Sequence, residues 1–421
     1  MHLNLARHSL WNRRGTVALT LITLIISIAL LLGIDHIRKE ARNSFSQTIS
    51  GTDLIVGARS GSINLLLYSV FRIGNPTNNI TWESYQDIAN HSAVAWTIPI
   101  TLGDSHRGYR VIGTNQDYFE HFQYGRRQNL EFAEGAQFEE LFDVVLGWEV
   151  AQALGYDMGT QLVIAHGMGE VSFVDHGDMP FTVTGILAPT GTPVDQSLHI
   201  SLEAWEAIHL GWESGMPDPR RTPDQEEVQE MDRSRLQPNE LTAAFVGVRS
   251  PVQTFALQRV VNNYRSEPLQ AVMPGVALSE LWQMIGVIEN VLLLIAFLVL
   301  IATLVGMTTS LLASMRERQR EMAILRALGA SPWTLVILIQ MEVLLITIGG
   351  LLLGSLVLWG SLQFAQPWLV SEFGLFIGTN IWNADTLTYG GVILGLALIL
   401  GLVPGAVAYR RALADGLSVK L

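Results

Sequence analysis

The chain has 421 residues, of which 49% are hydrophobic and 15% are charged, and its formal net charge is −12. This composition is too apolar for a soluble protein of that length and too charged for a protein that lies wholly in a membrane, so the chain must divide between water and lipid. The sequence contains no cysteine, which excludes a thiol nucleophile and requires any water-exposed domain to fold without disulfides.

Four apolar runs are long enough to span a ~30 Å hydrocarbon core, because each has about 20 or more residues. We therefore predict an α-helical membrane protein with four transmembrane helices. Their ranges are 16–35, 285–315, 333–360 and 387–408. Four spans place both termini on the same side of the membrane. No small-x-small cleavage site follows the first run, so this run is predicted to be an uncleaved anchor.

Basic residues indicate which side the termini occupy. Ten Lys or Arg residues lie in the flanking segments 1–15, 316–332 and 409–421, whereas the short loop 361–386 has none. Because short cytoplasmic segments carry an excess of Lys and Arg, the three basic segments are predicted to be cytoplasmic and the loop periplasmic. The predicted location is the bacterial inner membrane, with a large domain in the periplasm.

Residues 36–284 lie between the first two spans and are predicted to form this large α+β periplasmic domain. They carry 30 Asp or Glu and 16 Lys or Arg residues, so the domain holds the net negative charge of the chain. An acidic surface argues against nucleic acid or anionic lipid as its partner.

Each end of this domain is predicted to hold an α/β unit, and we expect 36–121 and 241–284 to form a single α/β subdomain. The first span is predicted to continue as a helical stalk to residue 50. Helical spacing and strand alternation predict three further elements near each end. These are a helix at 81–90 and strands at 94–100 and 109–112, then a strand at 243–248, a helix at 251–264 and a strand at 269–272.

The segment between these ends, 122–240, is predicted to be an inserted β-rich subdomain. Its strands are expected at 143–146, 161–165, 170–174, 181–186 and 198–201, with a helix at 149–154. Residues 213–240 contain eight acidic residues, four arginines and four prolines without apolar periodicity, which predicts a mobile surface loop.

Residues 316–331 form a short basic segment between the second and third spans. They contain the pattern Arg-x-Arg-x-x-Glu-Met-x-x-Leu-Arg-Ala-Leu-Gly-Ala, from Arg316 to Ala330. The positive-inside rule explains the arginines but not the spacing of Glu, Leu-Arg and Gly. The pattern resembles the cytoplasmic coupling segment of the FtsX/MacB-like permeases, which form the type VII branch of the ABC transporters. Segments 113–119, 144–159 and 181–187 are similar to the periplasmic core of the same family, so the resemblance covers nearly the whole chain.

This resemblance implies a stand-alone permease subunit that forms a homodimer, or pairs with a paralogous permease, and is bound to a separate ATPase. Closure of the ATPases would move the coupling segment, the second span and the first span with its stalk. In that scheme Glu321 and Arg326 pair on the docking helix and Gly329 ends it in a left-handed conformation. The residues assigned to coupling are Arg316, Arg318, Arg320, Glu321, Arg326 and Gly329.

Two alternatives stay open. In the first, the chain is a transmembrane signalling protein that regulates a periplasmic partner, like the namesake of the family, although that protein has a much smaller outer domain. In the second, the chain is a component of a zinc-handling system, because segments 57–59, 65–74 and 190–195 resemble stand-alone permeases that are associated with zinc-responsive gene clusters.

The sequence offers no familiar catalytic centre. Its two lysines, Lys39 and Lys420, lie outside any Gly-rich loop, so the chain cannot form a Walker A phosphate-binding loop. It also lacks the Gly-x-Ser-x-Gly pattern of a hydrolase nucleophile elbow. We therefore expect a non-catalytic subunit that binds no cofactor itself, with ATP and Mg²⁺ held by the partner ATPase.

Histidines and carboxylates near one predicted hairpin could converge on a metal such as zinc. No His-x-x-x-His or His-Glu-x-x-His spacing supports such a site, and solvated turn residues explain the cluster more simply, so no metal ligand is assigned. The residues concerned are His166, Asp175, His176, Asp178, Asp195 and His199.

Few strongly polar side chains interrupt the spans. Glu289 lies in the second span, and Gln340 and Glu342 lie in the third. An intramembrane carboxylate is a functional candidate because burying it unpaired is costly, but Glu342 is equally well explained as a hydrogen-bonded packing residue. These side chains do not line a continuous polar path, so we expect no hydrophilic route through the bundle. Small-residue pairs that let helices approach closely occur at 350/354, 391/395 and 401/405.

Overall fold

The computed structural model describes residues 10–11, 13–166, 179–211, 225–317, 324, 326–327, 329–373 and 377–414. The chain divides into two compact units. The helical unit comprises Met1–Glu40, Ile285–Trp368 and Ile377–Leu421, and the α+β unit comprises Ala41–Met284 with Leu369–Phe376.

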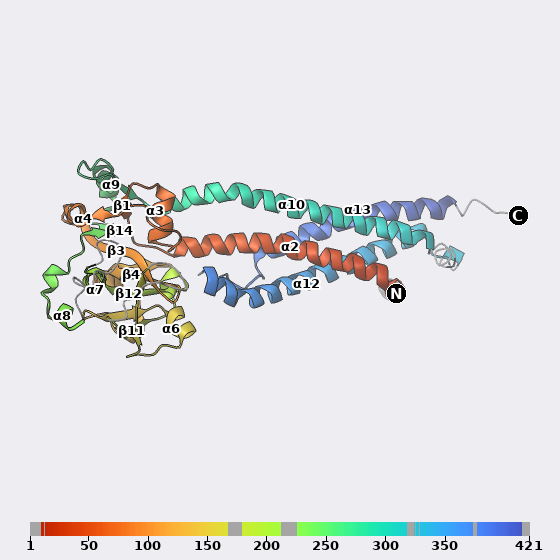
Figure 1. Ribbon diagram of the computed structural model, residues 1–421. Coiled ribbons are helices and arrows are strands. Elements are labelled where there is room, and N and C mark those ends of the chain that lie inside the picture. Colours follow the sequence, from red (N-terminus) through yellow and green to blue (C-terminus); the bar gives the residue numbers. More distant parts are fainter. Residues whose placement is uncertain are drawn as a thin grey trace. The chain divides into compact units, whose positions relative to one another are not determined.

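Four long helices account for nearly all of the described helical unit (Figure 1). They are α2 (Arg14–Gln47), α10 (Pro274–Glu317), α12 (Pro332–Phe373) and α13 (Ala384–Ala414). All four are long and apolar enough to cross a membrane, which confirms the four predicted membrane helices. The helices also extend past the apolar runs. Helix α12 continues to Phe373 through a segment that we predicted to be loop, because the thickness of the hydrocarbon limits the apolar run but not the helix.

Three of these helices run without interruption from one unit into the other, because the last residues of α12, from Leu369, also belong to the α+β unit. Helix α2 continues to Gln47, which confirms the predicted helical stalk, and α10 begins at Pro274, before the second apolar run. Proline suits the first turn of α10 because the N–H that it lacks would have no partner within the helix.

The α+β unit is built on a mixed sheet of eleven strands in the order β15-β1-β14-β3-β4-β12-β8-β11-β7, with β10 paired to β3 and β9 to β11. Two of its pairs, β4 with β12 and β8 with β11, are parallel. The strands of this sheet are β1 (Leu54–Ala58), β3 (Val94–His106), β4 (Tyr109–Thr114), β7 (Phe132–Gly135), β8 (Asp143–Leu146), β9 (Gln161–Leu162), β10 (Ala165–His166), β11 (Phe181–Leu187), β12 (Ser197–Ser201), β14 (Ala243–Val248) and β15 (Leu269–Val272). Two small ribbons join β2 (Ile80–Thr81) to β13 (Glu240–Leu241) and β5 (Gln123–Tyr124) to β6 (Gln128–Asn129).

Strand β3 joins the two halves of the sheet. Its first part pairs with β14, up to Ile100, and its second part pairs with β4 from Thr101 onward. Strand β4, which we placed with the ends of the domain, pairs with β12 of the inserted segment. The two predicted subdomains therefore share one sheet.

Helices cover both faces of this sheet. Along β8 the side chain of Val145 enters one hydrophobic core, whereas Val144 and Leu146 enter another, because successive strand residues point to opposite faces. Helices α3 (Ser62–Ser69) and α5 (Asp117–His121) pack in the first core. The opposite face carries α6 (Trp148–Leu154) and α7 (Leu202–His209) over one half, and α4 (Trp82–Ala89) and α9 (Thr254–Asn262) over the other.

In the α+β unit, two sequence predictions need correction and one buried strand was missed. Residues 225–240 are not a mobile loop, because they form helix α8 (Gln225–Glu230) and bury Val228 and Leu236 completely in the core beside α7. The helix expected at 251–264 is a 3₁₀ turn, Pro251–Gln253, followed by the shorter α9. Strand β1, fully buried in the sheet, was not predicted at all. The expected strand at 170–174 and residues 213–224 lie outside the described residues.

Candidate functional site

A buried ion pair holds helix α2 at its N-terminal end. The guanidinium of Arg13 donates from Nη2 to Oε2 of Glu342 on α12 over 2.8 Å. The Glu342 side chain is 1% exposed and that of Arg13 is 13% exposed. A buried carboxylate is tolerated when it is paired and hydrogen-bonded, so Arg13 explains how Glu342 can lie inside the helical unit.

The middle of α2 packs directly against glycines of α12. A Cβ added at Gly350 would lie 2.5 Å from Cδ2 of Leu24, and one at Gly354 would lie 3.1 Å from Cβ of Ile28. These contacts confirm that the 350/354 pair lets two helices approach closely. The 401/405 pair has the same role, because Gly401 and Gly405 receive side chains of α12, whereas the 391/395 pair faces open space.

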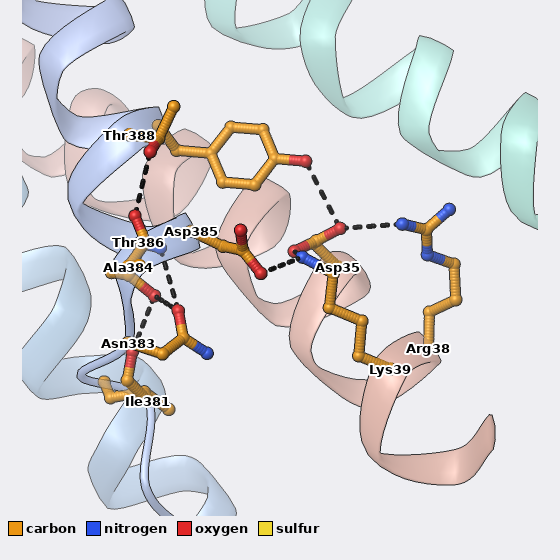
Figure 2. Close-up of polar contacts among 10 residues, drawn as sticks. Asp35, Arg38, Lys39, Ile381, Asn383, Ala384, Asp385, Thr386 and Thr388 are labelled. Carbon is orange, nitrogen blue, oxygen red and sulfur yellow. Dashed lines mark hydrogen bonds and ion pairs between the residues drawn. The ribbon is translucent and has the colours of Figure 1, made fainter. Parts of the chain in front are cut away.

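The other end of α2 is held by a polar network around Asp35 (Figure 2). Its carboxylate accepts hydrogen bonds from Arg38 Nη2 at 3.0 Å and from Lys39 Nζ at 2.7 Å, and it is buried. Lys39 bridges to Asp385 on α13 at 2.8 Å, and the hydroxyl of Tyr389 donates to Asp35 at 3.2 Å. The network therefore ties α2 to the first turns of α13.

A second contact at this end holds the segment before α13. Since a carbonyl can only accept, Nε2 of His36 donates to the Gly378 carbonyl, at 2.6 Å. The Gly378 N–H in turn donates to Glu40 Oε2 at 3.2 Å. A Cβ at Gly378 would lie 2.5 Å from that oxygen, so a larger residue there would displace the Glu40 carboxylate. Asn383 and Thr386 order the start of α13 beside this contact, because the Thr386 N–H donates to Asn383 Oδ1 at 2.9 Å.

Helix α10 is joined to α2 differently. One hydrogen bond of 2.7 Å links the hydroxyls of Ser27 and Thr303. Within the helical unit, the remaining burial of α10 follows a stripe on its C-terminal half, whereas most apolar side chains between Met284 and Ile295 are exposed. The first turns of α10 bury Ala277, Leu278 and Leu281 in the α+β unit. The stripe comprises Ala296, Leu300, Leu304, Met307, Leu311 and Met315. In the part of the chain that the structure describes, the salt bridges of α2 to other helices thus run to α12 and α13, and α10 packs mainly through apolar contacts.

The structure places only part of the predicted coupling segment. Gly329 has φ +89°, in the left-handed region that the predicted helix end requires, and Arg326 lies in helical conformation. Arg318, Arg320 and Glu321 lie outside the described residues, as does the side chain of Arg316. The role of these six residues stays a prediction.

The other polar residues predicted within the spans are separated in the structure. Gln340 donates through Nε2 to the Leu398 carbonyl on α13 at 3.3 Å. Glu289 is partly buried on α10. The bond of Gln340 therefore adds a tie between α12 and α13. Sequence reasoning missed Arg13, Asp35, Lys39 and Asp385, which lie near the ends of apolar runs where charged residues are ordinary.

The histidine and aspartate candidates of the α+β unit that can be described have structural surroundings. His199 is fully buried between Tyr118 and Phe119, and burial together with the Arg72 guanidinium lowers the pKa of its imidazole to about 3. Asp195 accepts from the N–H groups of Thr190 and Gly191 and so closes a turn. Asp175, His176, Asp178 and the side chain of His166 lie outside the described residues. Among described residues, the one group of three with metal-ligand spacing is Asp117, Glu120 and His121, which the sequence did not suggest.

Two other histidines of this unit have pKa values that are shifted in opposite directions. Nδ1 of His209 donates to the Trp205 carbonyl at 2.6 Å, so Nε2 can donate to the buried Asp104 carboxylate, at 3.3 Å, only if the imidazole is doubly protonated. Burial opposes this charge, but the Asp104 carboxylate outweighs it and raises the pKa of His209. His106 donates through Nδ1 to Val163 and receives the Tyr156 hydroxyl at Nε2, and burial lowers its pKa.

Comparisons with known proteins match both units. Residues 17–263 match the family model of the MacB-like periplasmic core domain, and residues 293–413 match that of the FtsX-like permease C-terminal region. No curated protein matches the chain.

Two solved structures are similar to part of the chain. The periplasmic region of MacB from Actinobacillus actinomycetemcomitans has 11% identity and a TM-score of 0.34, and the match covers 56% of this chain and 94% of that one. The extracellular domain of the noncanonic ABC-type transporter YknZ from Gram-positive bacteria has 13% identity and a TM-score of 0.31, with 52% and 98% covered.

Proposed function

The chain belongs to the FtsX/MacB-like family of ABC transporter permeases, and from that premise we propose that it converts ATP hydrolysis by a separate ATPase into motion of its α+β unit. It is a multi-pass membrane protein with an extracytoplasmic domain. In the proposal this domain faces the periplasm and the four helices cross the inner membrane.

The observation that carries this proposal is the continuity of α2 and α10. Each helix has apolar residues long enough to span a membrane and continues into the α+β unit without a break. A helix transmits an axial or tilting displacement along its length better than a flexible linker does, because its backbone hydrogen bonds fix every φ and ψ. Motion at one end of these helices would therefore reach the α+β unit.

The contacts of α2 favour a particular division of the bundle. Helices α2, α12 and α13 share the Arg13–Glu342 pair, the glycine contacts and the Asp35 network. Helix α10 is joined to α2 by the Ser27–Thr303 hydrogen bond and by the ring of Trp282, which packs edge-on against Phe45 and lies 5.2 Å from the Arg42 guanidinium. The rest of its buried surface in the helical unit is mainly an apolar stripe, which can slide with little loss of polar contacts. In this proposal α2, α12 and α13 form a fixed block, and α10 moves against it.

The partner ATPase would act at the C-terminal end of α10. This helix ends at Glu317, where the coupling segment begins, so a push on residues 316–331 is delivered to α10 directly. The ATPase would hold ATP and Mg²⁺. A second copy of the chain, or a paralogous permease, would complete a dimer with two ATPases.

Cargo or a partner protein would be engaged by the α+β unit or drawn from the outer leaflet. Two polar side chains of the bundle support this route because they are used in contacts between helices: Glu342 with Arg13, and Gln340 with the Leu398 carbonyl. Polar groups consumed in this way do not provide the several depths of polar lining that a hydrophilic solute needs.

The proposal can be tested with the ATPase supplied in trans. Gly329→Val forces a β-branched residue into a positive φ and should uncouple ATP hydrolysis from the conformational change of the permease, while leaving insertion and dimerisation intact. Glu321→Lys should do the same. Gly391→Val is the matched control, because its Cβ meets open space. Normal coupling in both Gly329→Val and Glu321→Lys would contradict the docking role, as would ATP hydrolysis by the purified permease alone.

A further inference from the structure

The α+β unit contains a cavity at a position where sheets of this kind bind ligands. The cavity has a volume of about 320 Å³. It lies where β4 and β12 end, since Asn115, Gln116 and Asp117 follow β4, and Ser201 and Glu203 come from the end of β12 and the start of α7. Small-molecule pockets usually begin at roughly 300 Å³, so the cavity is large enough for a small ligand or one long side chain.

Strands β4 and β12 are parallel neighbours whose following helices leave toward opposite faces. Ser201 pairs with Thr114, so the two strands end at the same edge. Tyr118 and Phe119 of α5 pack in the core on one face, whereas Ala207 of α7 packs in the core on the other. Such a divergence opens a crevice at the carboxyl ends of two parallel strands, and ligands of α/β sheets bind in crevices of this type.

Charge decides the chemistry of the ligand. The cavity is lined by four carboxylates, those of Asp117, Glu139, Glu140 and Glu203, and by one arginine, Arg233. Arg233 is directed at Glu140, with Nη2 3.1 Å from Oε2, and its Nη1 donates to the Glu139 carbonyl. Within the described ranges, no lysine or arginine pairs with Asp117, Glu139 or Glu203.

Neutral groups complete the cavity. Phe138 and Ser201 are buried in its wall, and Gln116 is held by a bond from Nε2 to the Phe138 carbonyl at 3.1 Å. Asn115 donates to Asp117 at 2.8 Å and fixes that carboxylate. An aromatic ring beside several carboxylates suits an alkyl chain that ends in a cation.

We propose that this crevice is a binding site for an organic cation, an ammonium or guanidinium group on an alkyl stem. Such a group occurs on a free polyamine and on a lysine or arginine side chain of a polypeptide, and both offer the same chemistry to Asp117, Glu139 and Glu203. The proposed site depends on the fold of the α+β unit and not on the proposed transport function, so the two proposals can be tested separately.

The test uses the full chain in detergent at physiological ionic strength, because the acidic domain attracts cations non-specifically at low salt. The probes are spermidine and tetra-arginine, with tetra-glutamate as the negative control, and binding is measured by isothermal titration calorimetry. Glu139→Gln and Glu203→Gln preserve shape and remove charge, and each should weaken binding of at least one cationic probe about tenfold, or 1.4 kcal/mol. Glu134→Gln, on the exposed strand β7, is the matched control and should change nothing.

Each outcome has a defined meaning. Binding of either cationic probe that weakens in the two cavity variants and not in Glu134→Gln supports the site, and preference for spermidine or for tetra-arginine identifies a free amine or a polypeptide as the source. Absence of saturable binding overturns it, and so does equal weakening in all three variants. If Ca²⁺ or Zn²⁺ binds there and displaces spermidine, an inorganic cation is the ligand and the proposal is wrong. Coupling of ATP hydrolysis, measured separately with Gly329→Val, reports on the proposed function alone.

Discussion

The two ends of helix α2 are fixed by contrasting means. At the N-terminal end one arginine meets one glutamate that is 1% exposed, whereas at the other end Asp35 shares three donors and Lys39, 35% exposed, bridges two carboxylates. A buried pair depends strongly on each partner, because removing one weakens the compensation of a charge in a medium of low dielectric constant. In the Asp35 network the cations Arg38 and Lys39 are partly exposed to water, so the loss of one ion pair lowers the free energy of unfolding only a little. We therefore expect the N-terminal end of α2 to stay attached to α12, whereas the contacts around Asp35 can break one at a time.

The largest effect is expected from Arg13→Met, which removes this partner from the buried Glu342. Breaking a buried ion pair costs about 3–5 kcal/mol, so the detergent-solubilised protein should unfold at a markedly lower temperature or denaturant concentration. The double variant Arg13→Met with Glu342→Gln should recover part of the loss, because the buried charge of Glu342 is gone. Equal stability of Arg13→Met and the parent protein would mean that the pair does not fix α2.

Gly350→Leu should have the next largest effect, because it disrupts the contact between α2 and α12 at a point between the two ends of α2. A side chain at this position meets Leu24 of α2, and overpacking of a tight interface costs about 1–3 kcal/mol. Gly391→Leu is the matched control, since its Cβ meets open space on α13. Unfolding curves of the two variants that coincide would show that α2 does not pack on α12 at this glycine.

Asp35→Asn sharpens the contrast at the network end. The amide keeps one hydrogen-bond acceptor but loses the ion pairs to Arg38 and Lys39, and the expected cost is about 1 kcal/mol because both partners are partly exposed. Asp385→Asn should cost less, since the Asp385 side chain is 59% exposed. The same unfolding measurement checks both variants, and a loss as large as that of Arg13→Met would remove the distinction between the two ends.

The smallest effect on stability is expected from a change of pH that titrates His209, which pairs with the buried Asp104 in the α+β unit. His209 has a raised pKa because Asp104 stabilises its imidazolium against the cost of burial. Its contribution to stability is therefore complete below the ordinary histidine pKa of about 6.5 and is lost as pH rises through the higher folded value. The melting temperature of the α+β unit should fall between pH 6 and pH 8, and His209→Gln should flatten that slope. A slope unchanged by His209→Gln would contradict the assignment.

The sequence predicted helices and strands well where apolar residues recur with a single regular spacing. Strands β8, β14 and β15 begin and end where alternation predicts, and the 350/354 glycines mark a true helix contact. Strand β1 was missed because its residues are buried on both faces, so it shows no alternation. Residues 225–240 were misread because their charge hid two isolated buried residues, Val228 and Leu236.

The site could not be assembled from the sequence because its partners are far apart in the chain. Arg13 and Glu342 are 329 positions apart, and Lys39 and Asp385 are 346 apart. Arg13, Lys39 and Asp385 each look like an ordinary charge near the end of an apolar run, and the positive-inside rule explains Arg13 without any partner. Glu342 stood out inside the third span, but nothing in the sequence pointed to its partner. Only the packing of α2 against α12 and α13 shows that these charges form ties.

The central claim is that α10 moves against a block formed by α2, α12 and α13, and spin-label distances test it directly. The chain has no cysteine, so labels can be placed at chosen exposed positions alone. One pair joins Ile26 of α2 to Val305 of α10, and the other joins Ile26 to Leu402 of α13; all three side chains are exposed. In complexes with the partner ATPase that carry one labelled copy, ATP binding should shift the Ile26–Val305 distance and leave the Ile26–Leu402 distance unchanged. A shift of the second pair as large as that of the first, or no shift in either, would contradict the account.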